Sequence, residues 1–128
     1  MTSKNLLPVI VVGGGIGGLA ASLSLSRLGI KVVVLEQAPE IGEIGAGLQL
    51  GPNGFAAFDA LGIGNEARSL AVYTDNMVMH DALDEYRVGY IPVGESFRQR
   101  FGNPYAVIHR ADMHKSLYNG ASASGLID

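Results

Sequence analysis

Cysteine is absent from the 128-residue sequence, and this absence removes several classes of chemistry. Disulfide bonds, thiolate metal sites and cysteine nucleophiles are all excluded. The formal net charge of -3 provides no basic surface for a nucleic-acid partner. No apolar run approaches the roughly 20 residues that a membrane-spanning helix needs. The first residues lead directly into an expected strand, so we expect no signal peptide and a cytoplasmic protein of one domain.

Residues 8–36 predict a strand, a turn, a helix and a second strand that ends in an acid. The run Val9–Val12 is β-branched throughout, as is typical of a strand buried on both faces. A helix is expected over Leu19–Leu28, where small residues are mixed with leucines. Lys31–Leu35 is a second apolar strand, and Glu36 follows it directly. This order predicts a βαβ unit.

The turn of this unit contains the pattern G-x-G-x-x-G, which is carried by Gly13, Gly15 and Gly18. In this pattern the first glycine permits a tight turn, the second lets a pyrophosphate approach the backbone, and the third lets the helix pack closely. Ile16 lies in the same turn, beside the N–H groups that a helix N-terminus offers to phosphates. Glu36 can accept hydrogen bonds from both hydroxyls of an adenosine ribose, and its charge would repel a 2′-phosphate. The strands, helix and acid together favour dinucleotide binding over a glycine-rich turn without a ligand.

The stretch Gln37–Gly54 is rich in glycine and proline. A glycine-dense loop of this length inside a compact domain is more often functional than a solvated connection, which is the alternative. Its glycines would let the backbone pass close to a ligand that lies across the ends of the sheet. Leu48–Leu50 has room for a short strand in which Gln49 faces away from its neighbours.

Two short helices are expected next. Asn53 is a candidate cap for a helix that runs to Leu61, and Asn65 is a candidate cap for a second helix through Ala71. The first of these helices has an apolar stripe, which we assign to the core, formed by Phe55, Phe58 and Leu61.

Alternation on both sides of a polar turn predicts an antiparallel hairpin over Asn76–Val93. A short helix is expected over Gly94–Gly102 and an apolar strand over Tyr105–His109. Arg110 opens the last helix. The residues of that helix that we expect to face inward are Met113, Leu117 and Tyr118.

Leu126–Asp128 has the character of an approach to a further parallel strand that does not follow. The chain is therefore expected to be the front part of a longer one. The expected fold is α/β: a Rossmann-like βαβ nucleotide-binding domain over residues 1–128, with a parallel sheet core and an inserted antiparallel hairpin.

Five stretches of the chain carry a family resemblance: Val11–Ala20, Leu35–Glu40, Gly45–Asn53, Ile91–Glu95 and Ile108–His114. They resemble the N-terminal part of single-component flavoprotein aromatic hydroxylases of the p-hydroxybenzoate hydroxylase fold. Within that family the sequence is most similar to 3-hydroxybenzoate 6-hydroxylases, with salicylate hydroxylases and 6-hydroxynicotinate 3-monooxygenases nearby. The first stretch is shared by many nucleotide-binding proteins, whereas the third and fifth are far more specific.

The resemblance implies FAD as the cofactor, with its ADP half on the βαβ unit. Gly13, Gly15 and Gly18 would hold the pyrophosphate, and Glu36 would bind the ribose with Gln37 beside it. Relatives of this family are roughly three times as long, so the fold is expected to be incomplete relative to the family.

The segment Gly45–Gln49 matches a loop that runs beside the isoalloxazine ring and the substrate in this family. The resemblance therefore implies that Ala46 and Gly47 contact the cofactor and that Gln49 presents a polar side chain to the same site.

Arg110 matches an arginine that contacts the flavin cofactor in relatives. The charge of Arg110 is permanent, and the start of a helix does not stabilise a cation, so this position itself indicates an anionic partner. The alternative is a salt bridge from Arg110 to Asp112 or Glu36.

The resemblance further implies NADH-dependent flavin reduction, followed by oxygen-dependent hydroxylation of an aromatic acid such as 3-hydroxybenzoate or salicylate. The family's catalytic residues lie beyond Asp128, so we assign none here and expect the chain alone to lack hydroxylase activity. Two alternatives stay open. One is an NAD-binding half-domain of a dehydrogenase, supported only by the glycine turn and Glu36. The other is an inert truncated fragment.

His109, Asp112 and His114 form a further cluster in the sequence, for which metal binding is conceivable. Their side chains are expected to diverge from a strand end and the following helix, and no further ligand has suitable spacing. We therefore expect structural or surface roles for them and no metal site.

Overall fold

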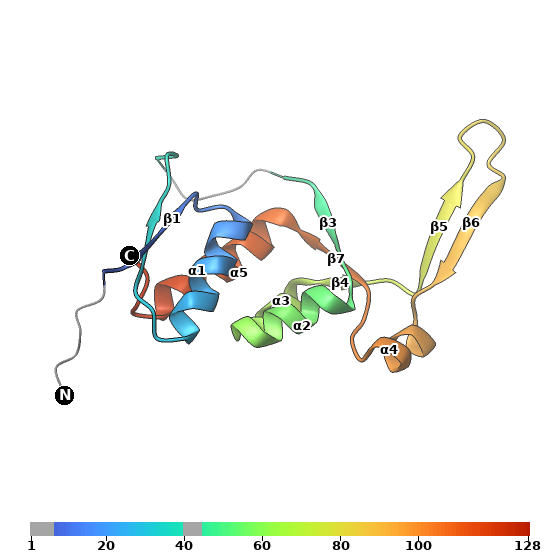
Figure 1. Ribbon diagram of the computed structural model, residues 1–128. Coiled ribbons are helices and arrows are strands. Elements are labelled where there is room, and N and C mark those ends of the chain that lie inside the picture. The colour runs from blue at the N-terminus through green and yellow to red at the C-terminus, as the bar shows by residue number, and fades with distance from the viewer. Residues whose placement is uncertain (1–6, 40–44) are drawn as a thin grey trace.

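A computed structural model describes residues 7–39 and 45–128 (Figure 1). The described elements alternate between strands and helices along most of the chain. In order they are β1 Val9–Val12, α1 Ile16–Arg27, β2 Val32–Leu35, β3 Gly47–Leu50, α2 Pro52–Leu61, α3 Gly64–Leu70, β4 Val72–Tyr73, β5 Asn76–His80, β6 Arg87–Pro92, α4 Glu95–Phe101, β7 Ala106–His109 and α5 Arg110–Ala123.

The predicted βαβ unit is confirmed. β1 and β2 pair in parallel, from Val9 opposite Val32 to Val12 opposite Leu35, and α1 makes the connection between them. The last residues of the chain add to this sheet, because Ile127 forms a parallel bridge to Val32. The expected approach to a further parallel strand is therefore confirmed, as an isolated bridge outside the named strands. Residues 126–128 begin a third parallel strand on the free edge of β2, held by hydrogen bonds that include Val34 N–H to the Asp128 carbonyl at 2.7 Å.

The expectation that β1 is buried on both faces was wrong. Val12 is 83% exposed and Ile10 is 62% exposed. The reason lies in the number of layers, because α1 packs against β1 and β2 from one side. Among the described residues no element covers the opposite face. A continuous apolar run is thus typical of a strand that can be buried on both faces. Whether each face is buried depends on whether another element packs against it.

A second sheet is antiparallel and has the strand order β3-β7-β4. Leu48–Leu50 and Tyr105–His109 were predicted as separate short strands, and the structure pairs them, with Gly47 opposite His109. β4 was not predicted, because two residues carry no alternation that sequence reasoning could detect. The pairing of β3 with β7 matters for the site, because it brings the glycine-rich segment at residues 45–49 to the start of α5.

The predicted hairpin is confirmed as β5 and β6. It extends away from the rest of the chain, on the right of Figure 1. The pairing runs from Asn76 opposite Pro92 to His80 opposite Arg87, with an irregularity between Met79 and His80. The predicted polar turn between the two strands is also present, and in it the Asp84 carboxylate accepts the N–H of Tyr86 at 2.9 Å.

Several helix starts differ from those expected. α1 begins at Ile16 rather than Leu19, so Gly18 lies inside the helix. Neither Asn53 nor Asn65 is an N-cap, because Gly51 and Ile63 hold those positions. Asn53 follows Pro52, whose fixed φ suits the first turn of a helix and moves the start of α2 forward. The short helix expected near residue 95 is confirmed as α4.

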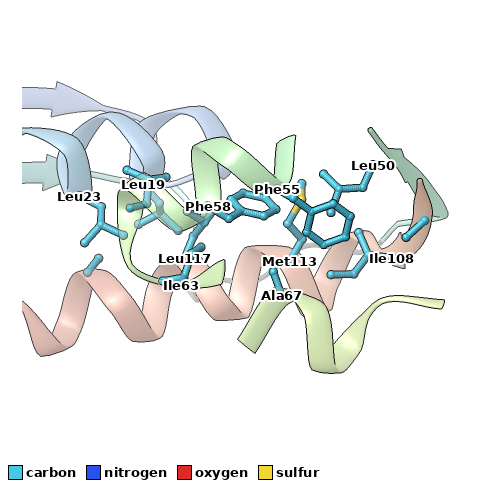
Figure 2. Close-up of a cluster of buried hydrophobic side chains, with 13 residues drawn as sticks. Leu19, Leu23, Leu50, Phe55, Phe58, Ile63, Ala67, Ile108, Met113 and Leu117 are labelled. Carbon is cyan, nitrogen blue, oxygen red and sulfur yellow. The ribbon is translucent and has the colours of Figure 1, made fainter. Parts of the chain in front are cut away.

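The hydrophobic core lies between α1, α2, α3, α5 and the antiparallel sheet (Figure 2). The stripe of α2 enters it as predicted, with Phe55, Phe58 and Leu61 all buried. The α5 prediction was correct for two residues, since Met113 and Leu117 are buried and Tyr118 is exposed. Residues 113, 117 and 121 repeat at the spacing of one helix face, whereas Tyr118 falls beside that face. α5 thereby packs along α1 and contacts the glycine turn through His114.

Candidate functional site

The glycine turn between β1 and α1 adopts the geometry that its sequence predicts. Gly13 has a φ of 101°, a conformation that L side chains rarely adopt. A Cβ on Gly18 would overlap the carbonyl oxygen of Gly13, so the first turn of α1 approaches the end of β1 as closely as glycine allows. The N–H of Gly13 donates to the Leu35 carbonyl at 2.7 Å, which ties the turn to the end of β2.

The first backbone N–H groups of α1 are hydrogen-bond donors that no side-chain cap occupies. Gly15 is the N-cap residue, and no side chain accepts a hydrogen bond from the first turn. The first turn also contains no acidic residue, so no side-chain charge of α1 opposes an anion there. Exposed N–H groups and the partial positive charge of a helix start suit a phosphate. Gly15 and Ile16 stand at this position because α1 begins at Ile16.

Glu36 lies directly beside the glycine turn. Its carboxylate accepts two backbone hydrogen bonds, from Gly14 N–H at 2.6 Å and from Ala38 N–H at 2.8 Å. These bonds stabilise the ionised form, Ala38 most strongly and Gly14 next, and they hold the pKa of Glu36 below its usual range. The carboxylate is therefore charged and fixed in direction at neutral pH.

A hollow of about 410 Å³ opens at the ends of the two parallel strands. Its lining residues are Val12, Gly13, Leu35, Glu36 and Gln37. Ligands of open α/β sheets bind outside the carboxyl ends of the strands, which is where this hollow lies. The structure thus brings Gly13, Glu36 and Gln37 to one opening.

Residues 45–49 form a second group, gathered around the start of α5. Gly45 lies so close to Arg110 that a Cβ on Gly45 would be 2.7 Å from the Arg110 Cδ atom. The carbonyl of Ala46 accepts the backbone N–H of Arg110 at 3.2 Å. Ala46 and Gly47 are exposed, so their backbone is accessible at this point. The structure therefore brings Ala46, Gly47 and Arg110 together.

Gln49 faces away from Leu48 and Leu50, as predicted. Leu50 is buried in the core, whereas Gln49 is exposed. Gln49 lines a hollow of about 280 Å³ together with residues of the hairpin, among them Met77 and Tyr90. This hollow differs from the one at Glu36, so the two groups of candidate residues occupy separate openings. Residues 40–44, which connect them along the chain, lie outside the described residues.

The first turns of α5 connect the two groups, through a residue that sequence reasoning placed among structural or surface positions. His114 is 4% exposed, and its Nε2 atom lies 2.7 Å from the carbonyl oxygen of Gly14. His114 is four residues after Arg110, so both side chains project from the same side of the helix. The spacing of His114, Leu117 and Ala121 is that of one buried helix face and was the signal available in the sequence.

The other histidines have local roles. His109 caps α5, because its Nδ1 atom accepts the N–H of Ala111 at 3.3 Å. His80 lies in the hairpin, with Nδ1 2.8 Å from the carbonyl oxygen of Glu85. In the part of the chain that the structure describes, no group of three metal-ligating side chains occurs, and no helix is both long and apolar enough to cross a bilayer.

The chain is also similar to several known proteins. A family model described as "FAD binding domain" matches residues 7–128. The chain is 71% identical over 122 residues to a 3-hydroxybenzoate 6-hydroxylase of Polaromonas naphthalenivorans, and 56% identical over 117 residues to one of Klebsiella oxytoca. These matches cover 95% and 91% of this chain and 30% of each relative. The chain therefore spans about 30% of the length of the curated relatives it matches.

A solved structure shares the fold over nearly the whole chain. The tetrameric form of 2-methyl-3-hydroxypyridine-5-carboxylic acid oxygenase superimposes with a TM-score of 0.82 at 25% identity. The superposition covers 98% of this chain and 32% of the other. The arrangement of parallel and antiparallel sheets described above is thus a known arrangement, which corresponds to about a third of that oxygenase.

Proposed function

Because the chain belongs to the FAD-binding-domain family, we propose that it forms the ADP-binding part of the FAD site in a monooxygenase that hydroxylates an aromatic acid. FAD is the cofactor of the family. The activity and the substrate are proposed from the relatives, of which the chain spans about 30%. The observation that carries the proposal is the hydrogen bond between Gly14 and Glu36, which holds the ribose-binding acid against the phosphate-binding turn.

The residues present fit the pyrophosphate of FAD. A bulky side chain at Gly18 cannot coexist with the turn, because even a Cβ would overlap the Gly13 carbonyl oxygen. The start of α1 has neither a side-chain cap nor an acidic residue. We assign Gly13, Gly15, Ile16 and Gly18 to the pyrophosphate, where Gly15 and Ile16 donate backbone hydrogen bonds.

Glu36 and Gln37 fit the adenosine ribose. The Glu36 carboxylate is held by two backbone N–H groups and still lines the hollow at the strand ends. A carboxylate has room for about four hydrogen bonds, so lone pairs remain for the two ribose hydroxyls. Its charge also disfavours a 2′-phosphorylated ribose.

Ala46, Gly47, Gln49 and Arg110 are proposed to serve the flavin end of the cofactor. The support is their gathering at the start of α5, with the exposed backbone of residues 46 and 47 beside Arg110. Arg110 supplies a permanent positive charge and a planar set of donors at this place. The role of Gln49 is to present a polar side chain at the hollow beside the hairpin.

The proposed reaction uses NADH and oxygen. When bound, FAD supplies the reduction and oxygen chemistry, and the protein supplies binding, orientation and electrostatics. The substrate class is a small aromatic acid, with 3-hydroxybenzoate as first choice because the relative at 71% identity is a 3-hydroxybenzoate 6-hydroxylase. We assign no catalytic residue within residues 1–128 and propose a cytoplasmic location. The chain by itself is expected to show no hydroxylase activity.

Ligand titration of the purified chain tests the proposal. FAD and 5′-ADP are expected to raise the midpoint of thermal unfolding in a concentration-dependent way, because each binds only the folded state. The 2′-phosphorylated analogue, 2′-phosphoadenosine 5′-diphosphate, is expected to bind more weakly than 5′-ADP. Glu36→Gln is expected to reduce that discrimination, since it removes the repelling charge.

Three outcomes would contradict the proposed function. An unchanged midpoint with FAD and with 5′-ADP would identify an inert fragment. A midpoint raised by NAD and not by FAD would favour the dehydrogenase half-domain. NADH oxidation coupled to a hydroxylated aromatic product would show that the chain alone is active.

A further inference from the structure

His114 is a buried polar residue whose side chain has one hydrogen-bond partner in the part of the chain that the structure describes, and that partner belongs to the glycine turn. Its Nε2 atom lies 2.7 Å from the carbonyl oxygen of Gly14, across a sequence separation of 100 residues. A carbonyl oxygen only accepts hydrogen bonds, so Nε2 carries the proton and donates. α5 therefore holds the glycine turn from inside the protein.

Gly14 is anchored on both of its sides. Its N–H donates to Glu36 at 2.6 Å, and its carbonyl accepts from His114. Gly14 is itself buried. A Cβ on it would lie 3.3 Å from both the Cβ atom and the Oε2 atom of Glu36. Two bonds in opposite directions along the chain leave the Gly14 peptide groups little freedom to rotate.

The bond to His114 has a consequence for the next residue. The peptide unit that joins Gly14 to Gly15 is planar and trans, so the Gly15 N–H points in the direction opposite to the Gly14 carbonyl. The carbonyl points inward, toward His114 on α5. The Gly15 N–H is thus directed away from α5 and outward from the turn, and no hydrogen bond among the described residues uses it.

We propose that His114 is a positioning residue, which directs the Gly15 N–H toward the diphosphate of a bound nucleoside diphosphate by holding the Gly14 carbonyl. The proposal rests on the proposed function, because it concerns the same site. In this proposal His114 does not touch the nucleotide. It acts on the nucleotide only through the peptide group that joins Gly14 to Gly15.

The test compares two ligands and two substitutions in the full 128-residue chain. 5′-ADP carries the diphosphate, and adenosine has the same base and ribose without it. His114→Met has a similar length and no donor, whereas His114→Gln keeps an N–H donor at the position of Nε2. Dissociation constants for both ligands are measured by NMR titration of amide shifts.

The expected result is selective. His114→Met is expected to weaken 5′-ADP binding by roughly tenfold, the effect of losing about one hydrogen bond to a charged group. Adenosine affinity is expected to change less than about twofold, because adenosine has no diphosphate to accept from the Gly15 N–H. His114→Gln is expected to recover most of the 5′-ADP affinity. Leu117→Val, on the same buried face of α5, is the control and is expected to lower stability without changing the ratio of the two affinities.

A purely structural role gives a different pattern. Equal weakening of 5′-ADP and adenosine in His114→Met, or an unchanged ratio, would overturn the assignment. If His114→Met does not fold, His114→Asn replaces it, because its donor is too short to reach Gly14 and the same selective loss is expected. Wild-type chain that binds no 5′-ADP would overturn the proposed function together with this inference, whereas an unselective His114→Met effect overturns this inference alone.

Discussion

Two strands of similar apolar character end in opposite environments. β7 lies in the middle of the antiparallel sheet, and its Ile108 is 2% exposed. β6 lies in the projecting hairpin, and its Ile91 is 55% exposed. Both strands are hydrogen-bonded to neighbours in the expected manner, so backbone pairing is not what separates them. The difference is the presence of packed layers on the side chains.

The hydrophobic core beside β7 is formed with side chains of α1, α2, α3, α5 and β3. Among the described residues the two hairpin strands pair only with each other, and a two-stranded ribbon exposes both faces unless another element covers them. Alternation in sequence therefore predicted the hairpin correctly and did not predict its exposure. Local pattern determines an element, whereas burial requires partners that are distant in sequence.

A matched pair of isoleucine substitutions gives the strongest test of this contrast. Ile108→Ala is expected to lower the free energy of unfolding by roughly 2–5 kcal/mol, because it leaves a cavity in a packed core. Ile91→Ala is expected to cost less than about 1 kcal/mol, because that side chain is largely solvated already. Urea unfolding followed by circular dichroism measures both. Similar costs at the two positions would show that the hairpin is covered in solution.

Glycine substitutions extend the contrast to the backbone. Gly18→Ala is expected to destabilise the chain by about 1–3 kcal/mol and to abolish 5′-ADP binding, because its Cβ overlaps the Gly13 carbonyl oxygen. Gly89→Ala in β6 is the control, since its Cβ would lie 3.6 Å from the nearest atom, the Met79 Cβ. It is expected to leave 5′-ADP binding unchanged. Retained binding in Gly18→Ala would refute the assigned role of the turn.

The pH dependence of stability tests whether Glu36 is held as described. Its pKa is lowered in the folded state by the N–H groups of Ala38 and Gly14, so the folded chain binds a proton less readily than the unfolded one. This contribution is complete above the unfolded pKa, about 4.3, and is lost as the pH falls through the lower folded pKa. Glu36→Gln is therefore expected to be less stable than wild type at pH 7, with a difference that shrinks on acidification.

Urea unfolding at a series of pH values from 7 to the acid range measures that difference. Glu85→Gln makes the same change in the turn of the hairpin, where the side chain is exposed. An equal and parallel effect in Glu85→Gln would assign the change to net charge instead of to the hydrogen bonds of Glu36.

The smallest expected effect on stability concerns a hydroxyl group buried in the hydrophobic core. The Ser22 hydroxyl on α1 is buried and has no hydrogen-bond partner in the structure. Ser22→Ala is expected to leave stability unchanged or to raise it by up to about 1 kcal/mol, because it removes an unsatisfied polar group from the core. Ser24→Ala, at an exposed position of the same helix, is the control. A loss of stability at position 22 would indicate a partner for the hydroxyl in solution.

Much of the site followed from sequence because its residues are neighbours in the chain. Gly13, Gly15 and Gly18 lie within six positions, and the structure confirms the tight turn at Gly13 and the close approach at Gly18. Asn53 and Asn65 show where local reasoning failed, since a preceding proline or a core residue moved each helix start. The placement of Gly45 against Arg110 required the pairing of β3 with β7, which no local pattern encodes. The ligand contacts of these residues stay predictions.

The sequence by itself determined the order of elements apart from β4, the glycine turn, the acid that follows β2 and the family, because each depends on short-range geometry or on residues at fixed spacing. Only the tertiary structure decided that β1 is exposed on one side, that residues 126–128 pair with β2 and that His114 reaches Gly14. Those facts depend on contacts between segments up to 100 residues apart. Such contacts form only when α5 packs along α1, and side-chain burial and the direction of the Gly14 carbonyl follow from that packing.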